Sequence, residues 1–338
     1  MDLPPFTRLA RLPTPIEKVE RWPRQDAGVE LWVKRDDLTA GAAGGNKIRK
    51  LEYILADAKR LGATALVTCG AAQSNHCRAT AIVAAQLGLA CTLLLRTDDG
   101  APAPLDGNWL LARLAGADVV WTDRAGYARA SEAMAEIARR YATQGGLAHV
   151  IPEGASTATG AMGYARAWQE LVLQARDTSV AFDVVVHPIG SGGTTAGLAT
   201  GAIAFGGSRA RILAVSVGGT RADMAARVHK IAQGVHDRYG GPDPDAVSAR
   251  VEILDQYVGA GYGVASAEEI ALAASFARAS GIVLDPTYGT KALVGLVKEI
   301  DCGNVARGAK VLFLHTGGVF GCFPARGTYA AVLDGAKS

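Results

Sequence analysis

A lysine that follows two glycines and an asparagine is the first candidate for chemistry in this chain. The stretch Gly44–Gly45–Asn46–Lys47 leads into an amphipathic run that predicts a helix. Glycines let the backbone approach a ligand closely. The cationic neighbours Arg49 and Lys50 should favour the neutral, nucleophilic amine of Lys47. Such a lysine could form a Schiff base with a carbonyl cofactor; the alternative is a solvated lysine at the start of a helix.

A second glycine-rich stretch has the residues of an anion site. Gly190–Ser191–Gly192–Gly193–Thr194–Thr195 follows an apolar strand at 184–186 and opens a helix of small residues. Free backbone N–H groups at a helix start, together with hydroxyls, bind anions. The alternative is a tight strand–helix turn that is capped by its own Ser or Thr.

The type of phosphate follows from what this stretch lacks. A dinucleotide fingerprint requires glycine where Thr195 stands, and an acidic residue after the next strand, which ends Ser216–Val217–Gly218–Gly219. The nucleoside-triphosphate motif G-x-x-x-x-G-K-[ST] is absent from the sequence. A phosphate monoester fits better, and combined with a Schiff-base lysine it indicates pyridoxal 5′-phosphate (PLP).

Short strands that alternate with helices must position these two stretches. Strands are expected at 30–33, 65–68, 90–95, 118–122, 148–152, 184–186, 212–217, 253–257, 282–284 and 311–315. This alternation predicts an α/β fold with parallel βαβ units. Since about ten strands exceed a usual single sheet, we expect two sheets.

Composition limits the function classes. The 338 residues are 49% hydrophobic, enough for one large or two ordinary domains. Because 35 basic residues face 32 acidic ones, we expect no nucleic-acid partner. No apolar run is long enough to predict a membrane span. The five scattered cysteines contain no C-x-x-C pair, so we expect no metal site, and their odd number without an apolar leader favours the cytoplasm.

Taken together, the motifs resemble those of the D-cysteine desulfhydrase and 1-aminocyclopropane-1-carboxylate (ACC) deaminase group of fold-type II PLP enzymes. The resemblance runs from about residue 13 to residue 318. It rests on Lys34–Arg35–Asp36–Asp37, Gly44 to Glu52, Gln73–Ser74–Asn75–His76, Gly190 to Gly197, Leu284–Asp285–Pro286–Thr287–Tyr288 and His315–Thr316–Gly317–Gly318. It implies a tryptophan synthase β-like fold of two doubly wound domains, a large one at 1–50 and 158–338 and a small one inserted at 51–157. The active site would lie in the cleft between them.

The resemblance also implies roles for individual residues. Lys47 would hold PLP and move protons at the substrate α-carbon. The cofactor would further contact Asn46, Asn75, Ser191, Gly192, Gly193, Thr194, Tyr288 and Thr316. The substrate would contact Ser74, Asn75, His76 and Tyr262, and catalysis would involve Lys47, Ser74, Tyr262 and Tyr288. Without the resemblance, Ser74 reads as a helix cap, His76 as a plain helix residue and either tyrosine as amphipathic filler.

Two positions depart from the ACC deaminases. Those enzymes have a glutamate where Gly289 stands and a leucine where Thr316 stands, so cyclopropane ring opening is disfavoured. Desulfhydrases usually have Ser or Thr followed by Gly after the tyrosine, whereas this chain has Gly289 and then Thr290. The partner of the pyridine nitrogen therefore stays open between Thr316 and Thr290. Cys322 is a further candidate for substrate specificity.

The resulting prediction is a PLP-dependent β-eliminating lyase for a small amino acid. D-cysteine, which would give pyruvate, sulfide and ammonia, is the first candidate. The alternatives are L-cysteate sulfo-lyase, ACC deaminase, and a phosphate- or nucleotide-binding module without covalent chemistry. A sulfonate would need an extra cation or a cluster of hydrogen-bond donors in the pocket, which the sequence does not locate. A cytoplasmic homodimer is expected from the resemblance.

Overall fold

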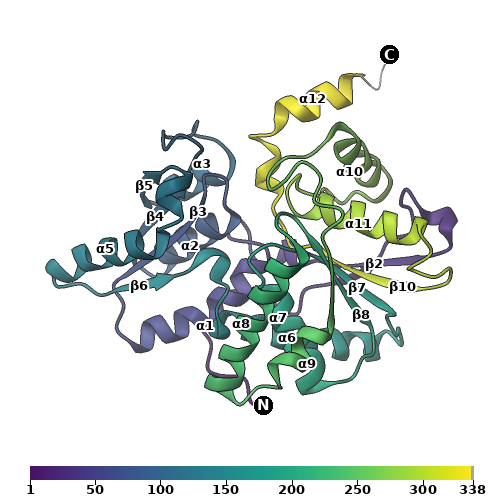
Figure 1. Cartoon of the computed structure of the whole chain (residues 1–338), viewed down its shortest axis with the longest axis horizontal. Helices are drawn as coiled ribbons and strands as arrows, with labels where there is room; N and C mark the ends of the chain where they lie inside the picture. The colour runs from purple at the N-terminus through teal and green to yellow at the C-terminus, as the bar shows by residue number, and fades with distance from the viewer. Residues whose placement is uncertain (336–338) are drawn as a thin grey trace.

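Two separate sheets organise the chain in the computed structural model, which describes residues 1–335 (Figure 1). The larger sheet has the strand order β1-β2-β10-β7-β8-β9, and its edge strand β1 pairs antiparallel with β2 while the other pairs are parallel. Its strands are β1 (Ile16–Lys18), β2 (Glu30–Lys34), β7 (Val184–Ile189), β8 (Arg211–Ser216), β9 (Val251–Leu254) and β10 (Lys310–Leu314). The predicted α/β fold with two mostly parallel sheets is confirmed.

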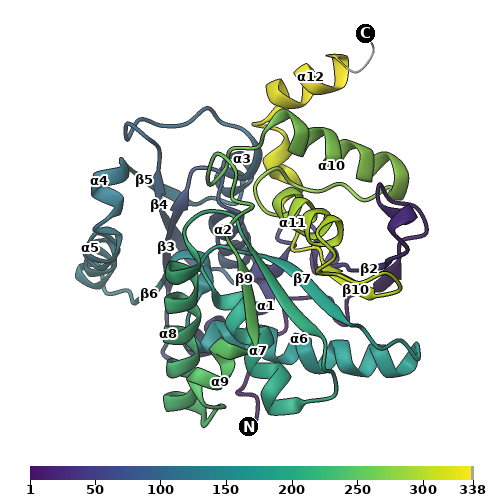
Figure 2. The same cartoon turned by 45° about the vertical axis from the view of Figure 1, so that its right-hand side comes forward.

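Helices cover both faces of the larger sheet (Figure 2). They are α10 (Ala267–Ser280) and α11 (Gly289–Asp301) on one face, and α6 (Ala158–Asp177), α7 (Gly193–Phe205) and α8 (Arg221–Tyr239) on the other. Successive side chains of a strand point to opposite faces. Val184 and Val186 accordingly pack in the core with α10 and α11, whereas Val185 packs with α6 and α7. Both faces are buried, which explains the continuous apolar run of β7.

The smaller sheet is formed by residues 65–151 and has the order β5-β4-β3-β6, with every pair parallel. It therefore lies within the segment 51–157, for which the inserted domain remains a prediction. Its strands are β3 (Ala65–Ala71), β4 (Ala90–Arg96), β5 (Asp118–Thr122) and β6 (Ala148–Ile151). One face is covered by α1 (Asn46–Arg60), α2 (Asn75–Gln86) and α3 (Gly107–Leu114), and the other by α5 (Ala130–Thr143).

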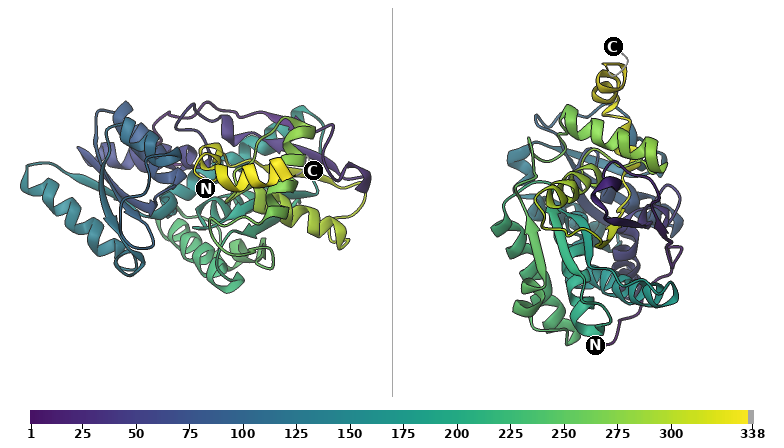
Figure 3. Two further views of the ribbon diagram at one scale, coloured as in Figure 1. Left: turned by 90° about the horizontal axis from the view of Figure 1, so that it is seen from above. Right: turned by 90° about the vertical axis from the view of Figure 1, so that its right-hand side faces the viewer.

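The remaining helices lie at the periphery. They are α4 (Arg124–Tyr127), α9 (Pro244–Ala249) and α12 (Arg326–Gly335). Figure 1 and the right-hand view of Figure 3 place the N-terminus and helix α12 at opposite ends of the molecule, with α12 projecting beside α10. Within residues 1–335, no helix combines the length and the apolar character that crossing a bilayer requires.

Helix α6 supports both helices that carry the candidate motifs. Gly163 of α6 lies against the backbone of α1, since an added Cβ would come within 2.2 Å of the Arg49 carbonyl oxygen. Gly197 of α7 faces α6 in the same way, with an added Cβ 2.3 Å from the Ala161 oxygen. The absence of side chains at these two positions lets three helices pack closely. The start of α1 and the start of α7 are thereby held near each other.

Two expected elements differ from the structure. The segment 282–284 was expected to be a strand, but it has no strand partner and forms no ladder. Ile282 and Leu284 are buried in the core beside α10 and α11, whereas Val283 between them is exposed. This alternation of buried and exposed residues resembles the pattern of a strand, although the chain turns at Asp285–Pro286. Strand β1 was not expected, because three residues with two charges carry too weak a pattern.

Candidate active site

A cavity of about 410 Å³ lies between the two sheets and is lined by residues of both. The carboxyl ends of β3, β4, β7 and β8 reach its wall, where open α/β sheets usually bind ligands. Every residue predicted to contact cofactor or substrate lines this cavity except Gly193, which lies directly behind the wall at the first position of α7. Cys322 does not line it; its thiol contacts the Leu284 carbonyl oxygen at 3.7 Å.

The backbone around Gly45 presents Lys47 to the cavity. Gly45 has φ +120°, and an added Cβ would lie 2.9 Å from the Thr316 carbonyl oxygen, so this close backbone approach requires glycine. The same oxygen accepts the Asn46 N–H at 3.0 Å. The first turn of α1 is thus tied to the segment after β10. The partly buried Lys47 side chain places Nζ 5.9 Å from the centroid of the Tyr288 ring.

The surroundings of Lys47 favour its neutral amine. Burial lowers the pKa of Lys47 to about 8, and the positive charge of Arg78 lowers it further, against the opposing carboxylates of Glu153 and Asp285. The explanation from the neighbouring Arg49 and Lys50 was wrong. Arg49 is ion-paired with carboxylates on the far side of α1, and neither Arg49 nor Lys50 is among the charges that shift the pKa of Lys47.

Arg78 is the cation that the sequence reasoning missed. It is buried, and its guanidinium donates to the Gly44 oxygen at 2.6 Å, to Asn75 Oδ1 at 3.1 Å and to Asn108 Oδ1 at 2.8 Å. Its face lies 4.8 Å from the centroid of the Phe320 ring. All these acceptors are neutral, so the positive charge is uncompensated near Lys47. Burial lowers the pKa of Arg78 only to about 10, which keeps it charged at neutral pH.

The depressed pKa of Lys47 gives a pH prediction. An amine with a pKa of about 8 is neutral above pH 8, whereas an ordinary lysine with a value of 10.5 is neutral only above pH 10.5. The rate at which apo-protein combines with PLP should therefore rise with pH to a midpoint near 8, as followed by stopped-flow absorbance. Nα-acetyl-lysine, measured in parallel, is the reference and should keep rising toward pH 10. A protein midpoint near that of the free amine would contradict the assignment.

The start of α7 and the segment before α6 form a polar cradle. Ser156 Oγ accepts the Gly193 N–H at 3.2 Å, lies 2.7 Å from Ser191 Oγ and accepts Lys50 Nζ at 3.1 Å. Lys50 also donates to the Gly154 oxygen at 3.0 Å. Gly192 has φ +87°, which turns the chain into the helix. Ser156 and Lys50 were not predicted to bind the cofactor, because Ser156 lies outside the motifs and Lys50 was considered only as a charge beside Lys47.

This cradle fits a phosphate monoester. The hydroxyl of Thr195 is buried and has no hydrogen-bond partner among the described residues, although Thr195 lines the cavity. The Lys50 amine contacts only neutral oxygens there, and burial lowers its pKa well below the ordinary value. Thr194 Oγ1 accepts Asn46 Nδ2 at 3.1 Å, so the cradle also touches the first turn of α1. An incoming phosphate would accept from the unpartnered hydroxyl and would favour the charged form of the lysine, which has no acidic partner.

Gly193 gives a test of the cradle. An added Cβ would lie 2.7 Å from Ser156 Oγ and 2.8 Å from Lys50 Nζ, so Gly193→Ala should displace both from the cradle. We expect the dissociation constant for PLP to rise roughly 10- to 100-fold, the value of one charge-assisted hydrogen bond. Equilibrium dialysis measures it. Gly41→Ala, where no atom lies within 4 Å of the added Cβ, is the matched control and should bind PLP normally. Unchanged affinity of Gly193→Ala would refute the cradle.

The cavity wall also carries two tyrosines in contact with each other. The hydroxyls of Tyr262 and Tyr288 lie 2.7 Å apart, and their rings meet edge-on with centroids at 5.9 Å. Burial raises the pKa of Tyr262 to about 12, although 42% of the residue remains exposed, and raises the pKa of Tyr288 well above its ordinary value. Both hydroxyls are therefore protonated at neutral pH and can donate a proton.

Asp285 fixes the backbone that presents Tyr288. Its buried carboxylate accepts the N–H groups of Thr287, Tyr288 and Gly289 at 3.1, 2.9 and 2.7 Å. This local turn explains the Leu284–Tyr288 motif. Thr290 Oγ1 is buried without a partner among the described residues and does not line the cavity, whereas Thr316 does. Of the two threonines considered for the pyridine nitrogen, only Thr316 can be reached from the cavity.

The start of α2 forms a third part of the wall. Ser74 is the N-cap, and its Oγ accepts the Cys77 N–H at 3.2 Å. Asn75 presents its side chain to the cavity while Oδ1 accepts from Arg78. His76 is buried with Nε2 2.7 Å from Thr68 Oγ1, and burial lowers its pKa well below the ordinary value. Ser74 is thus a helix cap that also faces the cavity, and His76 is a neutral, hydrogen-bonded wall residue.

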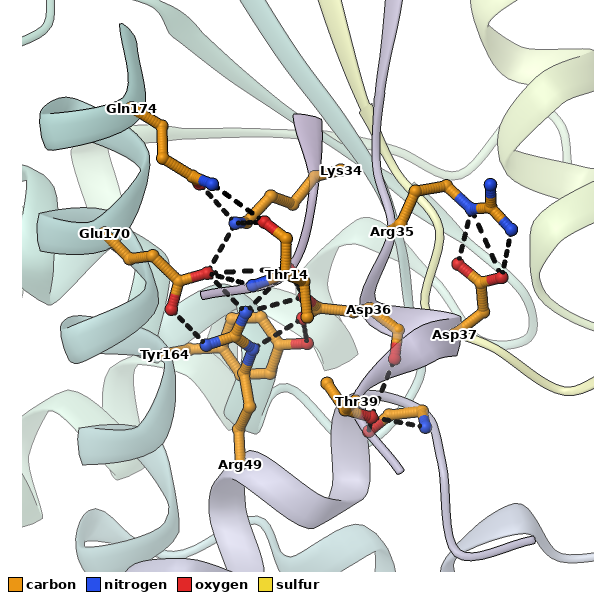
Figure 4. Close-up of polar contacts among 11 residues, drawn as sticks. Thr14, Lys34, Arg35, Asp36, Asp37, Thr39, Arg49, Tyr164, Glu170 and Gln174 are labelled. Carbon is orange, nitrogen blue, oxygen red and sulfur yellow. Dashed lines mark hydrogen bonds and ion pairs between the residues drawn. The ribbon is translucent and has the colours of Figure 1, made fainter. Parts of the chain in front are cut away.

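The Lys34–Asp37 motif lies outside the cavity and serves the scaffold (Figure 4). Arg49 donates to both carboxylate oxygens of Asp36, at 2.8 and 2.7 Å, and to Glu170 at 2.9 and 3.0 Å. Lys34 pairs with Glu170 at 2.5 Å. Tyr164 donates to Asp36 at 2.6 Å. Two cations and two carboxylates therefore join β2, α1 and α6 beneath the cavity.

Three further wall residues come from the smaller sheet and were not anticipated: Arg96, Tyr127 and Glu153. Arg96 ends β4, Tyr127 ends α4 and Glu153 follows β6. The only signal in the sequence was their place near the ends of predicted strands. The Tyr127 hydroxyl donates to Glu153 Oε1 at 2.9 Å, and the Arg96 guanidinium lies 5.2 Å from the centroid of the Tyr127 ring.

A lysine in a cavity between two parallel sheets, facing a phosphate cradle, defines a PLP-dependent enzyme of fold type II. The chain belongs to the family described as pyridoxal-phosphate dependent enzyme, whose model matches residues 7–317. Family membership argues against a binding module without covalent chemistry, and it makes PLP the cofactor of this enzyme.

Two proteins of known description and one crystal structure are similar to this chain over most of its length. The chain is 41% identical to a D-cysteine desulfhydrase of Yersinia pestis (strain Pestoides F) over 308 residues, covering 90% of this chain and 91% of that protein. It is 39% identical to a putative 1-aminocyclopropane-1-carboxylate deaminase of Thermotoga maritima, covering 93% and 96%. A crystal structure of an ACC deaminase homologue superimposes with a TM-score of 0.84 at 33% identity, covering 97% of this chain and 96% of that one.

Proposed function

We propose that this enzyme is a β-eliminating lyase for a small amino acid with a sulfur leaving group, and that D-cysteine is its principal substrate. The observation that carries the proposal is the protonated tyrosine pair beside Lys47. A base at the α-carbon and a proton donor beyond it are the two groups that β-elimination needs. The similarity to D-cysteine desulfhydrases supports the choice of substrate.

The residues divide into three binding parts. Ser191, Gly192, Gly193 and Thr194, together with Lys50 and Ser156, would hold the phosphate. Thr316 would face the pyridine nitrogen, and Asn46 would brace the cradle through Thr194. Ser74 and Asn75, at the positive end of α2, would receive the substrate carboxylate, with Asn75 also near the cofactor 3′-oxygen.

The protein's groups then carry out the proton transfers. Lys47 Nζ removes the proton from the substrate α-carbon, and its lowered pKa suits a base at neutral pH. PLP, when bound, withdraws the electron pair that this step releases. That pair forms the Cα=Cβ bond while the Cβ–S electron pair departs with sulfur. Tyr288, hydrogen-bonded to Tyr262, donates a hydrogen bond to the departing hydrosulfide. Hydrolysis of the released 2-aminoacrylate gives pyruvate and ammonia.

The site is less suited to ACC deamination. Gly289 has no side chain, and its N–H is bonded to Asp285, so this position offers no carboxylate for ring opening. The putative ACC deaminase among the relatives nevertheless keeps that substrate in the test. Pyruvate should form from D-cysteine faster than from L-cysteine, L-cysteate or D-serine, in coupled assays of the purified holoenzyme. Release of 2-oxobutyrate from ACC alone would overturn the proposal.

The proposal includes a cytoplasmic homodimer. All five cysteines are free, as expected for a protein of a reducing compartment. The dimer is carried over from the resemblance. Light scattering should give about twice the chain mass of 34.9 kDa, and a single chain mass would reject this part while leaving the chemistry intact.

A further inference from the structure

A glycine-rich flap carries Tyr262 along the cavity wall. The flap, defined as residues 259–265, connects the turn after β9 to helix α10. Three of its residues have φ values between +64° and +118°: Gly259, Gly261 and Gly263. Among the described residues, its one hydrogen bond to the rest of the protein joins the hydroxyls of Tyr262 and Tyr288. Glycines make this segment easy to bend, so something else must hold Tyr262 in place.

A buried ion pair holds both ends of the flap. Lys291, in the first turn of α11, donates to the Val258 carbonyl oxygen at 2.6 Å and lies 3.5 Å from Glu269 Oε1. The second oxygen of that carboxylate, Glu269 Oε2, accepts the Ser266 N–H at 2.8 Å. Val258 directly precedes the flap and Ser266 directly follows it. Two paired side chains therefore fix the point where the flap begins and the point where it ends.

The contacts of this pair are concentrated on the flap. An added Cβ at Gly259 would lie 3.1 Å from Glu269 Oε1 and 3.3 Å from Lys291 Nζ, so the first residue of the flap passes directly over the pair. The Lys291 side chain is fully buried and that of Glu269 is 11% exposed. Buried ion pairs add little net stability, because the loss of hydration opposes the attraction. Placement of the flap is a better physical reason for this pair than stability of the fold.

The wall beneath the flap has room for the Tyr262 backbone. Gly218, which follows β8 and lines the cavity, would place an added Cβ 3.0 Å from Tyr262 Cβ. The absence of a side chain there lets the flap lie close to the end of β8. In this position the Tyr262 hydroxyl reaches Tyr288 at 2.7 Å, and the two rings meet edge-on. A shift of the flap by a few tenths of an ångström would disturb this contact.

We propose that Lys291 and Glu269 are positioning residues, which hold the flap at both ends so that Tyr262 stays hydrogen-bonded to Tyr288 beside the sulfur leaving group. This inference rests on the proposed β-elimination. Neither residue of the ion pair lines the cavity, so both act through Tyr262. Their effect depends on the leaving group. Hydrosulfide, the stronger base, gains more from a well-placed hydrogen-bond donor than chloride does.

The first test compares two leaving groups in the holoenzyme. Lys291→Met removes the ammonium and leaves the Val258 oxygen without its donor. We expect kcat/KM for D-cysteine to fall roughly 10- to 100-fold, the value of a hydrogen bond to a charged group, while kcat/KM for β-chloro-D-alanine changes little. Pyruvate release measures both. Lys298→Met, which changes an exposed lysine in the last turn of α11, is the matched control and should leave both substrates unaffected.

A double-mutant cycle separates positioning from general damage to the structure. Tyr262→Phe removes the hydroxyl through which the ion pair acts, so adding Lys291→Met to it should have little further effect on D-cysteine. Equal losses with both substrates, or full additivity of the two substitutions, would overturn the inference. Lys291→Met combined with Glu269→Gln serves where the single variant does not fold. It leaves no unpaired buried charge and keeps an oxygen for the Ser266 N–H.

Hydrogen exchange requires no turnover and therefore separates failure of this inference from failure of the proposed reaction. In the holoenzyme, followed by mass spectrometry, the amides of residues 258–266 should exchange faster in Lys291→Met than in the wild type. Those of strand β10 should exchange alike in both proteins. Unchanged exchange of residues 258–266 would overturn the inference. Absence of pyruvate from every substrate, with faster exchange of this segment in the variant, would instead reject the β-elimination and leave the role of the ion pair intact.

Discussion

Lys47→Ala should bind PLP without the visible absorption of a lysine-linked cofactor, and its kcat should fall about 10³-fold or more. General base catalysis alone contributes roughly 10²- to 10⁴-fold, and this variant loses the covalent attachment as well. The absorption spectrum of the reconstituted protein and pyruvate release from D-cysteine measure the two effects. Borohydride should fix the cofactor to wild-type protein and leave the variant unlabelled.

The fold should survive this substitution. Lys47 forms no ion pair among the described residues, and its nearest recorded contact is the Tyr288 ring. Lys59→Ala, in the exposed last turn of the same helix, is the matched control and should retain colour and activity. If Lys47→Ala were coloured, borohydride-sensitive and active, another amine would hold the cofactor. Lys50 would then be the first candidate, since it lines the same cavity.

Arg49→Met should cost about 3–5 kcal/mol of the free energy of unfolding, because it leaves buried carboxylates without their cation. Arg49 has no measurable exposure and holds Asp36 and Glu170 together. Interaction with Arg49 and with Lys34 lowers the pKa of Glu170 to about 2 against the opposing effect of burial. The substitution removes the Arg49 interactions that lower this pKa, so that burial then disfavours the ionised carboxylate. Urea unfolding of apo-protein, followed by circular dichroism, measures the change.

The matched control for Arg49 lies on the same helix. Arg60→Met removes an exposed arginine whose contact is a 3.7 Å pair with Asp57, and such surface pairs contribute about 0–1 kcal/mol. A loss below about 1 kcal/mol in Arg49→Met would show that Lys34 alone can neutralise the cluster. Because Arg49 lies two positions after Lys47 on α1, we also expect weaker PLP binding in the variant. The ion pairs of Arg49 with Asp36 and Glu170, drawn in Figure 4, help to position the first turn of α1.

The sequence by itself determined the parts of the site that lie within one stretch of chain. Gly45 and Gly192 adopt positive φ values that the local turns require. These turns position Lys47 and Thr194, each of which follows its glycine by two residues. The cap at Ser74 and the turn that presents Tyr288 are also local, since each is made by backbone N–H groups within four residues. Local steric rules act on residue type alone, so such motifs can be identified without the fold.

Only the tertiary structure decided which distant groups complete the site and tune it. Lys50 meets Ser156 across 106 positions of sequence, and Arg78 reaches Gly44 across 34. Sequence neighbours suggested that Arg49 lowers the pKa of Lys47, but successive positions on a helix point in different directions, and the α6 carboxylate neutralises Arg49. Charge effects depend on distance and burial in space. For that reason the uncompensated cation Arg78 becomes evident only once the sheets and helices are packed together.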